Sequence, residues 1–193
     1  IENLDMPQFN RFCLLLTYLD AKPACIISPP AKFYRKITFF RKRFIINTET
    51  YSPGEDGVYT INDSIREPFE RFLTSSGFYW STVEDEKEAL EPHRKKPVKV
   101  RTVQYYVANS EKQLSRLLHA KTDREMGEAL GYPESAIVAY DQKKNLGENE
   151  TKILRHHYTR DTIPTHYLFL EFVPVFQEGE LIEEHDRIAR ERE

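Results

Sequence analysis

The chain has 193 residues, of which 39% are hydrophobic and 31% are charged, and its formal net charge is −3. This length and balance are typical of one globular domain with a substantial core, or of one domain with a small appendage, and only seven glycines are present, which argues against a flexible low-complexity chain. No apolar stretch approaches the roughly 20 residues that cross a bilayer, and no secretory pattern is recognisable at the N-terminus, so we expect a cytoplasmic protein with no membrane partner.

The first quarter of the chain predicts a helix, a short strand and an ambiguous segment. Apolar residues recur at helical spacing over residues 7–21, which predicts a helix. Residues 24–28 form a short apolar run that ends at two prolines and predicts a buried strand. Residues 32–47 fit a helix through Phe40, followed by a strand that begins near Phe44 because β-branched residues follow it.

The middle of the chain alternates turn signals with short periodic segments. Pro, Gly and Asp residues between positions 52 and 57 predict a turn. The expected elements that follow are a strand at 58–61, a helix at 68–75 that ends at Gly77, an extended segment at 78–83, an exposed acidic helical turn or loop at 84–91, a basic loop at 94–99 and a strand at 98–107.

The C-terminal half predicts mainly short helices. We expect one helix capped by Asn109 or Ser110 and another capped by Asp123. A helix opened by Pro133, a polar loop at 142–151, a strand at 167–173 and a charged helix at 178–193 complete the expected elements, the last with favourable pairs Glu183–Arg187 and Asp186–Arg190. Together the elements predict an α+β fold, a single compact domain (1–193) with several short helices packed on a small sheet.

Two cysteines, Cys13 and Cys25, lie in apolar patterns that predict burial. Buried reduced thiols are the expected state in a reducing compartment. The pair forms no CxxC motif and cannot alone make a structural zinc site. No cofactor is therefore expected.

The most distinctive stretch is residues 123–136, Asp-Arg-Glu-Met-Gly-Glu-Ala-Leu-Gly-Tyr-Pro-Glu-Ser-Ala. Its pattern predicts a helix that ends at Gly131, a corner at Tyr132 and a second helix that begins after Pro133. With the strand at 102–108 and the later Phe-Val-Pro at 172–174, it resembles a family of uncharacterised prokaryotic proteins whose hallmark is Leu-Gly-Tyr-Pro followed by two cysteines.

This resemblance supports the fold and implies no established activity. The cysteine pair is replaced here by Ser135 and Ala136, and Val175 and Phe176 follow where the family tends to carry further cysteines. A metal or redox role that depends on those thiols is therefore not expected in this chain. The retained corner leads us to expect a ligand or partner surface near Tyr132 and Ser135.

A basic and aromatic segment offers an alternative, nucleic-acid binding. No acidic residue occurs between Asp20 and Glu49, and Phe and Tyr residues are interleaved with the cations. Basic side chains neutralise phosphates, and exposed aromatic rings stack on bases. The other interpretation is a solvated basic face over core aromatics, and the isoelectric point of about 6.1 favours it. The candidate residues are Arg35, Lys36, Arg41, Lys42 and Arg43 in segment 32–44, with a second cluster at Arg94, Lys95 and Lys96.

Histidine and serine chemistry is the least favoured possibility. A metal or small-molecule enzyme site would combine His156, His157 or His166 with a carboxylate such as Asp161 or Glu171. Neighbouring strand positions point to opposite faces, and no HExxH spacing is present, so surface or partner-contact histidines are expected instead. Ser135 lies in no G-x-S-x-G elbow, and the acids at 123, 125 and 128 are explained by the helix dipole.

The sequence does not specify a function. It favours a non-enzymatic domain of unknown function that binds a ligand or a protein partner, as a degenerate relative of the cysteine-bearing family. The alternatives are a nucleic-acid-associated protein that uses segment 32–44 and a small-molecule enzyme with a site made of histidine and a carboxylate.

Overall fold

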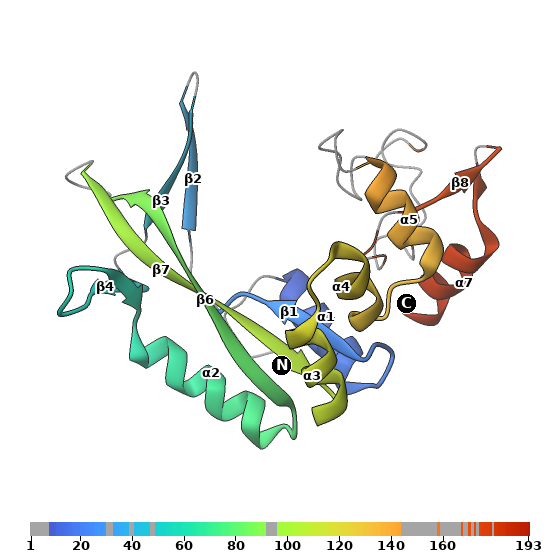
Figure 1. Cartoon of the computed structure of the whole chain (residues 1–193), viewed down its shortest axis with the longest axis horizontal. Helices are drawn as coiled ribbons and strands as arrows, with labels where there is room; N and C mark the ends of the chain where they lie inside the picture. Colours follow the sequence, from blue (N-terminus) through green and yellow to red (C-terminus); the bar gives the residue numbers. More distant parts are fainter. Residues whose placement is uncertain are drawn as a thin grey trace. The chain divides into compact units, whose positions relative to one another are not determined.

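The structure is a computed structural model, and it describes residues 8–29, 33–38, 41–46, 49–91, 96–143, 158, 167, 170, 172, 174–178 and 180–193. The fold is α+β, as predicted, with helices and a mixed sheet (Figure 1). The chain divides into two compact units, residues 1–115 and 116–193, and each is described by itself. The single domain expected for residues 1–193 stays a prediction.

The first unit is built on a seven-stranded sheet among the described residues. The order is β2-β3-β6-β7-β5-β4, and β1 also pairs with β7. The strands are β1 (Ala24–Ile27), β2 (Phe33–Thr38), β3 (Arg41–Ile46), β4 (Tyr51–Pro53), β5 (Tyr59–Ile61), β6 (Tyr79–Leu90) and β7 (Pro97–Ala108). The predicted strands at 24–28, 58–61 and 98–107 are confirmed.

The centre of this sheet is the long antiparallel pair β6–β7, whose register runs from Tyr79 opposite Ala108 to Leu90 opposite Pro97. The helical turn or loop expected at 84–91 is therefore wrong, since residues 84–90 belong to β6. The basic loop expected at 94–99 is wrong over 97–99, which belong to β7. Acidic residues have low strand propensity, and here the ladder to the valine-rich β7 overrides it.

Segment 32–47 forms the antiparallel hairpin β2–β3, in which Phe33 is opposite Ile46 and Thr38 is opposite Arg41. The helix expected through Phe40 is therefore wrong for residues 33–38, and the strand expected from Phe44 is confirmed over 44–46. The aromatic and β-branched residues within 33–38 favour a strand. Over so short a segment, the spacing of apolar residues does not distinguish a strand from a helix, which explains the wrong prediction.

Two helices complete the first unit, α1 (Gln8–Tyr18) against β1 and α2 (Asp63–Ser75) against β6. The helix predicted for 7–21 is confirmed in α1. The predicted helix at 68–75 is confirmed, although α2 begins five residues earlier at Asp63. Gly77 has φ +77°, the left-handed conformation that ends helices. Phe69 and Leu73 of α2 are buried in the core.

The core of the first unit gathers apolar side chains from α1, α2 and five strands. Cys13 and Cys25 form no disulfide and are both buried, as expected. The buried members are Cys13, Leu14, Cys25, Ile27, Tyr51, Ile61, Phe69, Leu73, Phe78, Ala89, Val100, Val103, Tyr105 and Val107.

The second unit contains the end of α3 (Glu111–His119), then α4 (Asp123–Ala129), α5 (Glu134–Lys143), the hairpin of β8 (Phe176–Gln177) and β9 (Glu180–Leu181), and α7 (Glu183–Glu191). Its core includes Ala136, Tyr167, Leu170, Phe172, Leu181 and Ala189. Within the described residues, no helix combines the length and the apolar character that crossing a membrane requires.

The corner at residues 129–134 is close to its prediction. Gly131 has φ +77° and α5 begins after Pro133. The predicted cap Asp123 is wrong: Thr122 is the N-cap, and its hydroxyl and the side chain of Glu125 form a reciprocal capping box. Asp123 is the first helical residue, where its charge complements the helix dipole.

The segment after residue 166 departs from its prediction. Tyr167, Leu170 and Phe172, the described residues of the strand expected at 167–173, are not in a strand, and the backbone N–H of Leu170 donates to the carbonyl of Tyr167. Phe176–Gln177 and Glu180–Leu181 pair as antiparallel strands, so the charged helix expected from 178 begins at Glu183. The polar loop expected at 142–151 lies almost wholly outside the described residues.

Candidate functional site

The candidate nucleic-acid residues of segment 32–44 lie on the hairpin β2–β3. Lys36 is opposite Arg43, Lys42 is opposite Ile37 and Arg41 is opposite Thr38. Neither strand contains an acidic residue. The register therefore concentrates cationic positions at the end of the hairpin where β2 passes into β3.

This hairpin forms one end of the sheet order, with β2 as the edge strand. β3 pairs with β6 in parallel at Ile45 opposite Leu90, next to the end of the hairpin that begins with Phe33. Figure 1 shows β2 and β3 as a two-stranded ribbon that runs away from the β6–β7 pair. The cationic positions lie toward the end of this ribbon that is away from the pairing with β6.

The second basic cluster has a different setting. Arg94 and Lys95 lie outside the described residues, and Lys96 is exposed. Lys99 is opposite Glu88 in the β6–β7 register. Opposite charges directly across a strand pair attract each other, and Lys99 and Arg101 of β7 both lie across from acidic residues of β6.

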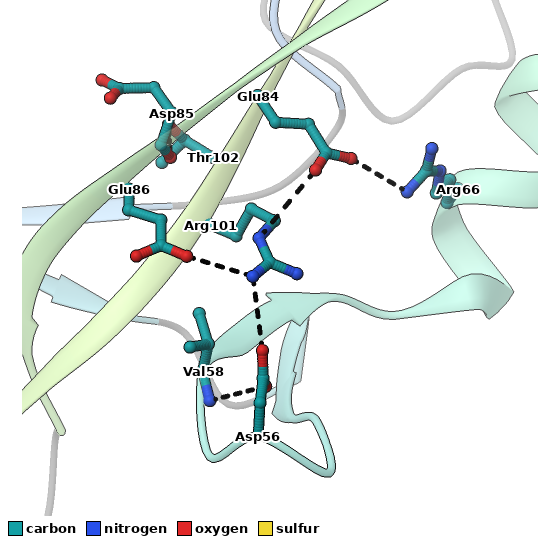
Figure 2. A network of polar contacts seen from close by, with 8 residues as sticks. All are labelled: Asp56, Val58, Arg66, Glu84, Asp85, Glu86, Arg101 and Thr102. Carbon is teal, nitrogen blue, oxygen red and sulfur yellow. Dashed lines mark hydrogen bonds and ion pairs between the residues drawn. The ribbon is translucent and has the colours of Figure 1, made fainter.

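Arg101 is the clearest example of this neutralisation (Figure 2). Its Nη2 lies 3.0 Å from Oε1 of Glu86 and 3.3 Å from Oδ2 of Asp56, and its Nε lies 3.9 Å from Oε2 of Glu84. The hydrogen bond to Glu86 and the nearby carboxylates raise the pKa of Arg101 above its ordinary value. This guanidinium therefore acts as an internal counterion for the acidic strand β6.

Asp56 connects this network to the turn between β4 and β5. Its Oδ1 accepts the backbone N–H of Val58 at 3.0 Å. That hydrogen bond, with the guanidinium of Arg101, holds the pKa of Asp56 below its ordinary value. The carboxylate thus closes the turn and ties it to β7.

A second arginine extends the network to α2. Arg66 donates from Nε to Oε1 of Glu70 at 2.8 Å and reaches Oε1 of Glu84 at 3.6 Å. The hydroxyl of Tyr105 also donates to Oε1 of Glu70, at 3.0 Å. The pKa of Tyr105 is raised, mainly by burial and in addition by the hydrogen bond to Glu70. The network joins α2, β6, β7 and the β4–β5 turn, which is a structural role.

The second predicted site, around Tyr132 and Ser135, contacts the C-terminal segment of the same unit. The ring of Tyr132 lies 5.9 Å from that of Phe172. Ser135 Oγ donates to Oε2 of Glu184 at 2.7 Å and lies 2.8 Å from Nε2 of His185. A ligand site at these two residues stays a prediction, and these contacts give the corner a structural role of its own.

His185 is fully buried. Its ring packs edge-on against Phe172 with centroids 4.9 Å apart. The backbone N–H of Val175 donates to Nδ1 at 3.1 Å. Burial lowers the pKa of His185 to about 4, although the nearby charge of Glu184 acts in the opposite direction. The imidazole is therefore neutral at pH 7.

These contacts determine the order of protons in the Ser135–His185 pair. A backbone amide can only donate, so Nδ1 must be the unprotonated nitrogen, and the single ring proton is on Nε2. Nε2–H then donates a hydrogen bond to Ser135 Oγ, and the hydroxyl of Ser135 donates its own hydrogen bond to Oε2 of Glu184. A general base would need the reverse order, with Nε2 accepting the serine proton and Nδ1–H held by an acceptor. The pair is thus arranged as a hydrogen-bond clasp and not as an activated nucleophile.

The histidine hypothesis falls outside the described structure: His156, His157, His166, Asp161 and Glu171 are not among the described residues. Within the described part of the chain, no group of three or more His, Cys, Asp or Glu residues is placed to hold a metal ion.

Sequence reasoning missed His185. Its signal was present, since His185, Ile188 and Ala189 follow helical spacing on the buried side of α7. The Arg101 network was also missed, because it depends on pairing acidic strand β6 with β7.

Comparison with known proteins adds no relative: no family model, no curated protein and no solved structure matches this chain. The functional argument therefore rests on the residues themselves.

Proposed function

We propose that this protein is a non-enzymatic binding protein whose partner is a nucleic acid, held by the β2–β3 ribbon. One observation carries the proposal: five cationic positions (35, 36, 41, 42 and 43) and no acidic position lie on one edge hairpin. Cations that are grouped without acids attract phosphate, and release of condensed counterions drives the association.

The contrast with β7 supports this choice of surface. Arg101 is ion-paired with Glu86 and Asp56, and Lys99 lies across from Glu88, so the cations of β7 have acidic residues beside them. The net charge of −3 and the acids of β6 make the rest of the molecule a poor site for phosphate. A nucleic acid is therefore expected to contact the ribbon locally.

Two further parts of the proposal concern the setting. The buried thiols of Cys13 and Cys25, which form no disulfide, support a reducing, cytoplasmic location, where thiols stay reduced. The resemblance of residues 123–136 supports a prokaryotic origin. The proton order at Ser135 supports binding over hydrolysis.

The experiment is fluorescence-anisotropy binding of labelled DNA and RNA to the full chain at about 50 and 200 mM salt. Five phosphate contacts give a slope of about −4.5 in log K against log salt, so affinity is expected to fall roughly 500-fold over this range. In a test variant, Arg41, Lys42 and Arg43 are all changed to Glu, and binding at low salt is expected to be lost.

A matched control carries the same change in net charge elsewhere, with Arg71, Lys112 and Lys121, all exposed, changed to Glu. Retained binding in this control shows that the ribbon, and not net charge, is responsible. Equal loss in both variants, or no binding by the wild type at the lower salt, overturns the proposal. The ribbon cations would then serve to prevent edge-to-edge pairing of β2.

A further inference from the structure

We infer that the partner is double-stranded DNA, with the β2–β3 ribbon placed in its major groove between two rows of phosphates. This inference rests on the proposed function and names its ligand. It follows from the register of the hairpin, which decides the face on which each cationic position lies.

The cationic positions occupy both faces of the ribbon. Alternate positions of a strand lie on opposite faces, and directly opposed positions in an antiparallel pair share a face. Lys36 is opposite Arg43, and Arg41 is two positions from Arg43, so these three share one face. Arg35 and Lys42 lie on the other face, because Arg35 is opposite Phe44 and Lys42 is two positions from Phe44.

Two charged faces fit a ligand that presents phosphates on two sides. A single strand offers one phosphate row, which a ribbon would follow with one face. The groove of a duplex is bordered by two phosphate backbones, so a ribbon within it meets phosphates on both sides. Positions 36, 41 and 43 would then lie on the side of one backbone, and positions 35 and 42 on the side of the other.

The dimensions select B-form DNA. Strands of a pair lie about 4.8 Å apart, and six residues extend about 20 Å. The major groove of B-DNA is about 12 Å wide and admits a two-stranded ribbon. The major groove of A-form RNA is deep and narrow, and protein side chains cannot enter it. The pairing with β6 is at Ile45, toward the other end of the hairpin from Arg41, so the cationic end is the part that we propose enters the groove.

The test compares a 20-base-pair DNA duplex, one of its strands alone, and the duplex RNA of the same sequence, each with the full chain. Two variants separate the faces: Lys36, Arg41 and Arg43 changed to Gln, and Arg35 and Lys42 changed to Gln. Thermal melting of each variant checks that it is folded. The wild type is expected to bind duplex DNA most tightly.

Both variants are expected to weaken duplex binding, and the salt slope should decrease in magnitude by about 2.7 for the first and about 1.8 for the second. Single-stranded binding that equals or exceeds duplex binding, or dependence on one face alone, overturns the duplex inference and leaves the proposed function standing. Absence of binding to all three ligands overturns both. The preference of the wild type among the ligands decides the question even if a variant fails to fold.

Discussion

Val175 donates its backbone N–H to Nδ1 of His185 at 3.1 Å, and this one contact determines the tautomer of a buried imidazole. The neutral ring carries its proton on Nε2, and this N–H donates a hydrogen bond to Ser135 Oγ, whose hydroxyl in turn donates to Glu184. The N-terminus of α5, the segment before β8 and the first turn of α7 are joined by this chain of hydrogen bonds. Protonation of Nδ1 would set two donors against each other and break it.

We therefore expect acid to destabilise the protein through His185. The pKa of His185 is about 4 in the folded state and about 6.5 when unfolded. Since the unfolded state takes up the proton first, stability is complete above about pH 6.5 and is lost as the pH falls toward 4. The expected loss at pH 5 is about 2 kcal/mol, measured by denaturant unfolding at pH 7.5 and pH 5.

The matched control for this prediction is His185→Asn, whose amide oxygen can still accept from Val175 but does not titrate. Carboxylates contribute equally in both proteins, so the variant should lose less stability between the two pH values. NMR of the ring nitrogens is an independent check, and it should show Nδ1 unprotonated and titration near pH 4. If wild type and variant lose equal unfolding free energy between the two pH values, or if Nδ1 carries a proton at neutral pH, then His185 does not hold the hydrogen-bond arrangement described here.

Replacing Ser135 with Ala should lower the free energy of unfolding by about 1 to 2 kcal/mol. The buried Nε2–H of His185 would lose its acceptor, and a buried donor without a partner is costly. Ser64→Ala, at an exposed position in the first turn of α2, is the control and should stay within about 0.5 kcal/mol of the wild type. A Ser135 variant as stable as this control would contradict the structural role.

The same proton order predicts that Ser135 is not activated. A fluorophosphonate probe, which reacts with serines that a base has activated, should leave the purified protein unlabelled. Ser135→Ala is the reference for background labelling. Labelling that disappears in this variant would show that Nε2 accepts the serine proton, and it would return the chain to the enzyme class.

Arg101→Gln should destabilise the first unit because it leaves Asp56, Glu84 and Glu86 without their shared counterion. The comparison is Arg71→Gln, which removes one exposed pair with Glu67; such pairs contribute little. We expect the larger fall in melting temperature for Arg101→Gln, and this fall should shrink at high salt because the remaining repulsion is screened.

A second substitution identifies the cause of that fall. Adding Glu86→Gln to Arg101→Gln removes one of the repelling charges, so the double variant should be more stable than the single one. If Glu86→Gln lowers the melting temperature equally in both backgrounds, the two side chains do not interact and the network has no energetic role.

The features that the sequence predicts well are those set by local chemistry. Gly131 and Pro133 determine a corner through backbone preferences, and the apolar spacing of Phe69 and Leu73 determines the buried face of α2. These features need no knowledge of distant residues, and all of them are confirmed.

The features that it missed depend on partners far away in the chain. Residues 84–90 are acidic and have low strand propensity, yet they form a strand because β7 offers a complete ladder. Ser135 is an ordinary residue of a helix start until α7 brings Glu184 and His185 to it, about 50 positions later. Such pairings depend on tertiary structure, which the local sequence does not reveal. The candidate cations of the ribbon could be found because a run of basic residues without acidic ones is visible in the amino-acid composition alone.

Gly127 offers a last test, because it has a packing role that its helix propensity opposes. A Cβ added there would lie 2.9 Å from Cγ1 and 3.2 Å from Cδ1 of Ile137, and Ile137 is buried. Alanine is a better helix former than glycine by up to about 1 kcal/mol, whereas overpacking costs about 1 to 3 kcal/mol. We expect Gly127→Ala to destabilise the protein, measured by denaturant unfolding.

In an Ile137→Ala background the clash is absent, so there Gly127→Ala should be neutral or stabilising. Destabilisation of the same size in both backgrounds would show that the close approach of α4 and α5 at these two residues is not the reason for glycine at position 127.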